Sequence, residues 1–193
     1  MRILIFDNYD SFTYNLVHVV EKIIHEKVDV FRNDKISLEK IDEYDKIILS
    51  PGPGLPSESG LLIPLIKKYA SSKSILGVCL GQQAIAESFG GKLINLKNVY
   101  HGVATEIIVN TKRTPSENDV FKSLPNEFEA GRYHSWIVSK ENFPADLEIT
   151  AEDEDGVIMA LRHKKFDVQG VQFHPESVLT PLGEQIMRNW LNV

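Results

Sequence analysis

Residues 75–83 read ILGVCLGQQ, and this stretch contains Cys79, the only cysteine in the chain. Gly77 and Gly81 lie two residues before it and two residues after it. Glycine permits a sharp turn and close backbone approach. A nucleophile between two small residues is typical of a strand-to-helix elbow, where the next backbone N–H can help to form an oxyanion hole. A lone cysteine is more often a small buried hydrophobe, but the two glycines favour a nucleophile at Cys79.

The residues on either side of Cys79 fit an elbow. We expect residues 74–78 to form a short buried strand and residues 80–89 to form a helix, which the glycines at 90 and 91 end. The apolar residues of this helix recur at helical spacing, at Leu80, Ala84, Ile85 and Phe89. Cys79 would then lie at a helix N-terminus, where the helix dipole stabilises a thiolate.

Strands and helices alternate through the first half of the chain. The expected strands cover residues 2–6, 28–32, 46–50 and 74–78, and the expected helices cover residues 11–25, 60–70 and 80–89. This alternation predicts a parallel sheet with helices on both faces.

In the second half of the chain, short strands replace the alternation of strands and helices. Five short strands are expected at residues 105–110, 127–133, 147–152, 157–162 and 168–173, and a helix is expected at residues 181–191. The pair Asp155-Gly156 indicates a hairpin turn, and we expect the acidic run 153–155 to be its solvated tip, since it lacks the spacing of a calcium loop. The fold class is therefore α/β, a mostly parallel central sheet flanked by helices with an antiparallel extension, in one domain over residues 1–193.

The composition excludes several classes of protein. The net charge is −6 and no lysine or arginine stripe is present, which argues against nucleic acid as a partner. The first apolar run is short and is interrupted by Asp7 and Asp10, so it is neither a signal peptide nor a membrane span. One cysteine excludes an intramolecular disulfide and a multi-cysteine metal site, which favours a reducing, cytoplasmic location. No cofactor is expected.

A thiol nucleophile needs a base, and the base needs an orienting group. Of the six histidines, His18 and His25 lie on a predicted helix and His163 lies in a charged run, so we expect all three at the surface. His174 directly follows a predicted strand, and Glu176 lies two residues further on, where it could hold the imidazole in one tautomer. Glu176 could instead pair with a surface cation, but its occurrence beside a strand-end histidine in a chain with a cysteine elbow favours the catalytic interpretation.

Ligand sites in open α/β sheets lie beyond the carboxyl ends of the strands. Three predicted strands end in suggestive segments: Asp7 to Asp10, Ser50 to Gly54, and Cys79 itself. The turn Gly52-Pro53-Gly54 lacks the ending of a phosphate-binding P-loop. We expect it to be a rigid turn that directs the N–H groups of Gly52 and Gly54 at a developing oxyanion.

These motifs together carry a resemblance to a known family. GVCLGQQ at 77–83, HPES at 174–177 and SPGPG at 50–54 resemble the class I glutamine amidotransferases of the triad type. DNYDSFTYNL at 7–16, HG at 101–102 and RYHSW at 132–136 resemble the members that serve anthranilate synthase or 4-amino-4-deoxychorismate synthase. The resemblance extends over nearly the whole chain.

The resemblance implies a role for each matching residue. Cys79 is the nucleophile, His174 the base and Glu176 the group that orients the base. Gly52 and the backbone of Leu80 form the oxyanion hole. The residues implied in binding glutamine are Gly52, Pro53, Gly54, Gln83, Ser135 and Trp136. Two positions depart from the pattern, because Gln82 stands where many relatives have histidine and Val103 stands where many have lysine.

The implied reaction is hydrolysis of L-glutamine to glutamate and ammonia, with the ammonia passed to a separate synthase subunit that aminates chorismate. The folate-pathway synthase is an alternative to anthranilate synthase as the partner. Two other hypotheses remain open: a cysteine hydrolase that acts alone, and a non-catalytic scaffold that only regulates a synthase.

Overall fold

A computed structural model describes residues 1–97, 99–114 and 118–193. Within these residues the main sheet has nine strands in the order β2-β1-β3-β4-β11-β10-β9-β6-β7. The first five of these strands are parallel: β2 (Asp29–Arg32), β1 (Ile3–Asp7), β3 (Lys46–Leu49), β4 (Ser74–Val78) and β11 (Val168–Val171). The other four continue the sheet with antiparallel pairing: β10 (Ile158–His163), β9 (Leu147–Glu152), β6 (Val103–Val109) and β7 (Glu127–Arg132). The predicted parallel sheet with an antiparallel extension is therefore confirmed.

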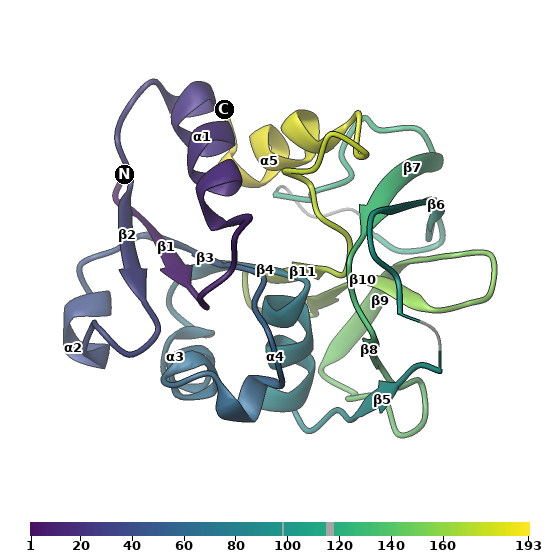
Figure 1. Cartoon of the computed structure of the whole chain (residues 1–193), viewed down its shortest axis with the longest axis horizontal. Coiled ribbons are helices and arrows are strands. Elements are labelled where there is room, and N and C mark those ends of the chain that lie inside the picture. Colours follow the sequence, from purple (N-terminus) through teal and green to yellow (C-terminus); the bar gives the residue numbers. More distant parts are fainter. Residues whose placement is uncertain (98, 115–117) are drawn as a thin grey trace.

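Helices cover both faces of the parallel half of the sheet. Figure 1 shows α1 (Thr13–Ile24) and α5 (Gly183–Leu191) above the sheet, and α3 (Leu62–Tyr69) and α4 (Leu80–Ser88) below it. Side chains of β1 alternate between the two layers, because Ile3 and Ile5 pack with α1 and α5 whereas Leu4 and Phe6 pack with α3 and α4. This two-sided burial explains why β1 and β3 are mostly apolar along their length, whereas the edge strand β2 is not.

The structure adds short elements that the sequence pattern did not predict. Strands β5 (Leu93–Asn95) and β8 (Trp136–Val138) pair as a separate two-stranded sheet, α2 (Leu38–Ile41) has four residues, and a 3-10 turn covers Pro56–Glu58. Elements of three or four residues are too short for a hydrophobic period to reveal. The pairing of β5 with β8 matters for function because it fixes the segment that contains Ser135 and Trp136.

Strand β11 ends earlier than the expected range of 168–173. Its last partner on β4 is Val78, which pairs with Val171, and beyond that point β4 turns away at Cys79. Gln172 still bonds to β10, from its N–H to the Met159 carbonyl, whereas the N–H of His174 bonds to the carbonyl of Gly131 in β7. Residues 172–174 therefore continue past the end of β4 to the carboxyl end of the parallel strands, where Cys79 also lies.

Two residues that the sequence pattern placed at the surface are buried. His163 is buried because its ring stacks on Phe166 with centroids 4.2 Å apart, while its Nδ1 accepts hydrogen bonds from the N–H groups of Lys165 and Phe166. Asp153 is also buried, because it forms an ion pair with Arg132 at the end of β7. Only Glu154 and Asp155 form the exposed tip of that hairpin. The predicted surface positions of His18 and His25 are confirmed.

Across the described residues, none of the helices combines the length and the apolar character that crossing a membrane requires.

Candidate active site

Cys79 lies at the junction of β4 and α4 in a backbone conformation that non-glycine residues rarely adopt, with φ 52° and ψ −102°. The two flanking glycines permit this elbow. A Cβ on Gly77 would lie 2.4 Å from the carbonyl carbon of Gly81, so a side chain at Gly77 would collide with the helix backbone. Strain of this kind, held by the surrounding structure, is typical of functional sites.

His174 and Glu176 form a buried pair at the end of β11. His174 Nδ1 lies 2.7 Å from Glu176 Oε1, and their side chains are 2% and 0% exposed. The turn that carries them is fixed, because Thr180 Oγ1 donates to the carbonyl of His174 at 2.6 Å and accepts from the N–H of Gly131 at 3.0 Å. With Nδ1 directed at the carboxylate, the other ring nitrogen, Nε2, is left for a reacting group.

The electrostatic surroundings of His174 favour its protonated form. Burial lowers the pKa of this imidazole, but the neighbouring Cys79 and Glu176 outweigh burial and raise the pKa to about 10. His174 is therefore an imidazolium at neutral pH in this arrangement. Such a group can stabilise a thiolate and can give a proton to a leaving nitrogen.

The turn after β3 approaches the elbow closely. A Cβ on Gly52 would lie 2.7 Å from both Asn8 Cβ and Leu80 Cδ2, so only glycine fits there. Asn8 holds the start of this turn: its N–H donates to Ser50 Oγ at 2.8 Å, and its Nδ2 donates to the Ser50 carbonyl at 2.9 Å. The N–H of Leu80 occupies the first position of α4, which has no carbonyl partner inside the helix. Gly52 and Leu80 therefore lie close together next to Cys79.

One cavity of about 240 Å³ brings most of the predicted site residues together. Its lining includes seven of them: Gly52, Pro53, Gly54, Cys79, Gln83, Ser135 and Trp136. Its remaining lining residues are Val99, Tyr100, His101, Tyr133 and His134. His174 and Glu176 lie behind this lining as buried residues, and Leu80 is buried below it.

The far wall of this cavity is held by main-chain pairing. Residues 92–97 and 99–102 run along residues 132–139, with hydrogen bonds from Leu96 N to the Ser135 carbonyl and from Tyr100 N to the His134 carbonyl. The Trp136 carbonyl accepts from Gln83 Nε2 at 2.8 Å and pairs with His134 Nδ1 at 3.1 Å. Gln83 Nε2 also lies 3.2 Å from Gln172 Oε1. With both N–H bonds of Gln83 used in this way, its Oε1 is left as an acceptor for a ligand.

Behind this wall lies a buried polar network that the sequence pattern did not reveal. Arg132 and Asp153 form an ion pair at 2.7 Å with both side chains 1% exposed, and Arg132 Nε donates to His134 Nε2 at 3.1 Å. The Arg132 guanidinium also covers the Tyr100 ring at 3.7 Å. The RYHSW motif contains two members of this network. The pairing of Arg132 with Asp153 could not be inferred from their spacing in the sequence, because only the antiparallel strands bring these two residues together.

The network holds His134 in its neutral form. Burial and the adjacent Arg132 charge lower the pKa of His134 to about 3. Its Nε2 accepts from Arg132, so its Nδ1 carries the proton that faces the Trp136 carbonyl. His134 is thus an unsuitable general base and instead fixes the cavity wall.

We expect His134 to make the protein less stable in acid. The pKa of His134 is lower in the folded protein than its unfolded value of about 6.5. The contribution of neutral His134 to the free energy of unfolding is therefore fully present above pH 6.5 and is lost as the pH falls from 6.5 toward 3. The expected loss is about 1.4 kcal/mol of unfolding free energy per pH unit in that window. Urea unfolding at pH 7.0 and 5.0 measures it, and His134→Gln, which offers one donor and one acceptor without titrating, is the matched control. Equal pH dependence in the two proteins would contradict this assignment.

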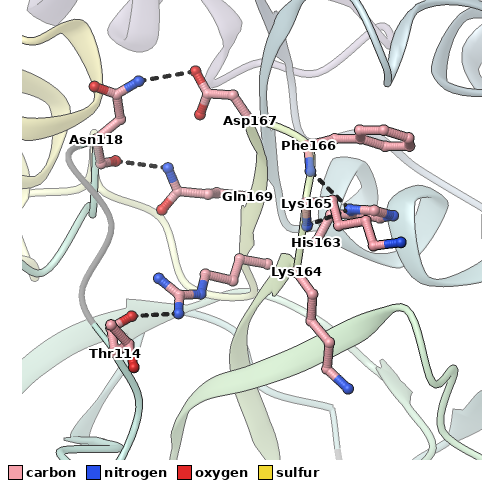
Figure 2. Close-up of a pocket in the computed structure, with 9 residues that line it drawn as sticks. Thr114, Asn118, His163, Lys164, Lys165, Phe166, Asp167 and Gln169 are labelled. Atoms are coloured by element: carbon pink, nitrogen blue, oxygen red, sulfur yellow. Dashed lines mark hydrogen bonds between the residues drawn. The ribbon is translucent and has the colours of Figure 1, made fainter.

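A larger cavity of about 370 Å³ lies elsewhere and brings none of the predicted site residues together. Figure 2 shows its wall, where Gln169 bonds to the Asn118 carbonyl and the Asn118 amide bonds to Asp167. His163 also lines it, with its ring nitrogen bonded to the N–H groups of Lys165 and Phe166. Because the smaller cavity contains Cys79 and six other predicted site residues and the larger one contains none, we assign the reaction site to the smaller cavity. Within the described residues, no cluster of three or more His, Cys, Asp or Glu side chains could hold a metal ion.

The two departures from the family pattern occupy different environments. Gln82 is fully buried in α4, and neither of its amide atoms has a hydrogen-bond partner among the described residues. It packs against Gly170 of β11, so it supports the elbow from below without reaching the cavity. Val103 begins β6, is partly exposed, and pairs in register with Arg132.

Residues 4–193 match the family described as glutamine amidotransferase class-I. The chain is 43% identical over 195 residues to the bifunctional protein TrpGD of Thermotoga maritima, a match that covers 100% of this chain and 32% of that protein. It is 42% identical over 191 residues to the aminodeoxychorismate/anthranilate synthase component 2 of Bacillus subtilis, a match that covers 98% of this chain and 95% of that protein. Among solved structures, a candidate GMP synthase subunit from Thermoplasma acidophilum is similar with a TM-score of 0.83 and 28% identity, covering 100% of this chain and 92% of that one.

Proposed function

The chain belongs to the class-I glutamine amidotransferase family, and on that premise we propose that it hydrolyses L-glutamine to glutamate and ammonia with Cys79 as nucleophile. The observation that carries this proposal is the buried His174–Glu176 pair next to a cysteine on a strained elbow, beside a cavity of about 240 Å³. A buried imidazolium beside a thiol is the arrangement that a cysteine hydrolase needs.

The reaction proceeds in two halves. The Cys79 thiolate attacks the side-chain carboxamide carbon of glutamine, and the N–H groups of Gly52 and Leu80 stabilise the resulting oxyanion. His174 Nε2 gives its proton to the leaving nitrogen, so the carbon–nitrogen bond breaks, ammonia departs and a thioester forms on Cys79. Neutral His174 then takes a proton from water, which attacks the thioester and releases glutamate. Glu176 holds Nδ1 throughout and keeps Nε2 directed at the reacting atoms.

The cavity lining suits the amino acid that the reaction requires. Gly54, Gln83, Ser135 and Trp136 line the cavity together with Cys79. We propose that these residues bind the carboxylate and amino ends of glutamine. Pro53 also belongs to this binding site, where it stiffens the turn. The pairing of residues 92–97 and 99–102 with residues 132–139 holds this wall in place.

Ammonia made in this cavity serves a second reaction. We propose that a chorismate-using synthase subunit receives it, as the subunit name of the Bacillus subtilis relative indicates. Anthranilate synthesis for tryptophan is the main hypothesis, and the aminodeoxychorismate synthase of folate synthesis is the alternative, because that name carries both reactions. We place residues 1–193 in one amidotransferase domain and the reaction in the cytoplasm, where the free Cys79 thiol stays reduced.

One exposed apolar side chain lies at the site itself, because Val99 lines the cavity and is 70% exposed, which suits contact with a partner. The loop 7–11 also reaches the catalytic residues: Asn8 bonds to the turn before Gly52, and the adjacent Phe12 packs edge-on against His174 with centroids 5.5 Å apart. We therefore propose that the loop 7–11 and the segment around His101 form a docking face that couples the partner to the turn 52–54.

We expect the isolated chain to be a poor glutaminase that the synthase and chorismate activate. Coupling between sites typically amounts to about 1–3 kcal/mol, which corresponds to a rise in kcat/KM of roughly 5- to 150-fold. Steady-state glutaminase kinetics on the chain alone, on the complex, and on the complex with chorismate measure it. Equal kcat/KM in all three states would favour a stand-alone hydrolase, and no ammonia release in any of them would favour a non-catalytic scaffold.

A further inference from the structure

Gln172 lies between the nucleophile and the substrate-binding wall. It follows β11, is fully buried, and directs its Nε2 at Cys79 Sγ over 3.5 Å. Its Oε1 accepts from Gln83 Nε2 at 3.2 Å. The side-chain amide therefore uses its donor end for the sulfur atom and its acceptor end for Gln83, and this orientation satisfies both neighbours.

Two amides in series thus connect the sulfur to the wall of the cavity. Gln172 bonds to Gln83, and Gln83 bonds to the Trp136 carbonyl at 2.8 Å, which also pairs with His134 Nδ1 at 3.1 Å. His134 in turn accepts a hydrogen bond from Arg132, and Arg132 also donates to Asp153. Because this series of bonds is buried, each bond is stronger than it would be in water and limits the movement of the next.

A hydrogen-bond donor at this position acts on the thiolate more than on the thiol. Hydrogen bonds to charged groups are about twice as strong as those between neutral groups. The Gln172 amide therefore stabilises the reactive form of Cys79 from the side of β11, while His174 stabilises it from the neighbouring turn. It also fixes the sulfur against rotation about the Cys79 side-chain bond.

We propose that Gln172 is a positioning residue for the nucleophile, a second donor to the Cys79 thiolate that also aligns it with the glutamine-binding wall. This inference rests on the proposed role of Cys79 in glutamine hydrolysis. The alternative is that Gln172 only supports Gln83, in which case its loss would weaken glutamine binding and leave the sulfur unchanged.

The test compares Gln172→Met with a matched control, Gln169→Met. Gln169 is also buried and also makes two hydrogen bonds, with the Asn118 carbonyl and the Val120 N–H, but it lines the other cavity (Figure 2). Both variants therefore lose a buried glutamine with two partners. The readouts are thermal unfolding, glutaminase kinetics in the synthase complex, and the pH dependence of Cys79 alkylation by iodoacetamide, followed by mass spectrometry.

We expect Gln172→Met to lower kcat/KM about 10- to 100-fold, mainly through kcat, and to move the alkylation midpoint to higher pH. Gln169→Met lowers the unfolding temperature and leaves both readouts unchanged. If Gln172→Met fails to fold, Gln172→Asn replaces it. Asparagine is one methylene shorter, so its amide donor lies further from the sulfur and no volume is added, and we expect the alkylation midpoint to move in the same direction.

A raised KM with an unmoved alkylation midpoint would overturn the proposal and assign Gln172 to Gln83 support alone. Alkylation reports on Cys79 even in a protein without glutaminase activity. If wild type releases no ammonia, the proposed function fails, yet the shift between wild type and Gln172→Met still decides whether Gln172 acts on the sulfur.

Discussion

Replacing Cys79 with serine is expected to abolish glutamine-dependent synthesis by the complex while synthesis from added ammonium salt continues at the wild-type rate. Removal of the nucleophile from a hydrolase lowers kcat by up to about 10⁶-fold, and serine cannot form the stable thiolate that the neighbouring imidazolium supports. The synthase chemistry needs only ammonia, so an external supply bypasses the lost step. The measurement is product formation from chorismate with either nitrogen source.

The substitution is well suited to this test because it disturbs little else. Cys79 is buried, and its backbone conformation is fixed by the N–H bond to the Val171 carbonyl and by the close packing of Gly77 on Gly81, which serine leaves in place. Unchanged unfolding and unchanged ammonia-dependent synthesis are the controls. Retention of glutamine use by the folded variant would remove Cys79 from the mechanism.

The elbow and the sheet could be predicted from the sequence because local signals agreed there. The apolar run 74–78, the glycine spacing around Cys79 and the glycines at 90 and 91 all indicate the same strand, turn and helix. Agreement between propensity, pattern and turn residues is what specifies a structure strongly. The contact between His174 and Glu176 could be predicted for the same reason, since a two-residue separation after a strand leaves few arrangements, whereas their catalytic roles stay a prediction.

The surroundings of the site could not be predicted, because they depend on pairing between distant segments. Asp153 reads as part of an acidic hairpin tip, yet it neutralises buried Arg132 once β7, β6 and β9 are neighbours. Gln172 reads as an ordinary strand residue, yet the end of β4 at Cys79 directs it to the sulfur. No hydrophobic period and no residue spacing in the sequence predicts either contact.

The charge nearest each buried histidine explains why their chemistry differs. His134 and His174 are both buried in the same region, but Arg132 faces the first whereas Glu176 faces the second. Burial and the neighbouring cation lower the pKa of His134 to about 3, whereas at His174 burial also lowers the pKa but the Cys79 sulfur, as its thiolate, and the Glu176 carboxylate outweigh it and raise the pKa to about 10. The sign of the nearest charge, not burial alone, therefore separates a structural imidazole from a proton-transferring one.

His174→Ala is expected to damage glutamine hydrolysis far more than Glu176→Ala does. Removing His174 eliminates the proton donor to the leaving nitrogen and the partner of the thiolate, and general acid–base catalysis is typically worth about 10²–10⁴-fold. Removing Glu176 leaves an imidazole that is less well oriented and whose pKa is lower, since the carboxylate is one of the groups that raise it. We expect that loss to be roughly tenfold in kcat/KM, with the basic limb of the pH–rate profile moved to lower pH.

The two variants can be compared because the turn that carries both residues is held by main-chain contacts. Thr180 Oγ1 bonds to the carbonyl of His174, and the N–H of His174 bonds to the Gly131 carbonyl, so neither alanine removes these bonds. Steady-state kinetics in the synthase complex from about pH 6 to 10, with thermal unfolding as the control, make the measurement. If Glu176→Ala were the worse lesion in folded protein, the carboxylate would be acting on the substrate or the proton directly. The buried pair at 2.7 Å would then have to be assigned the opposite way round.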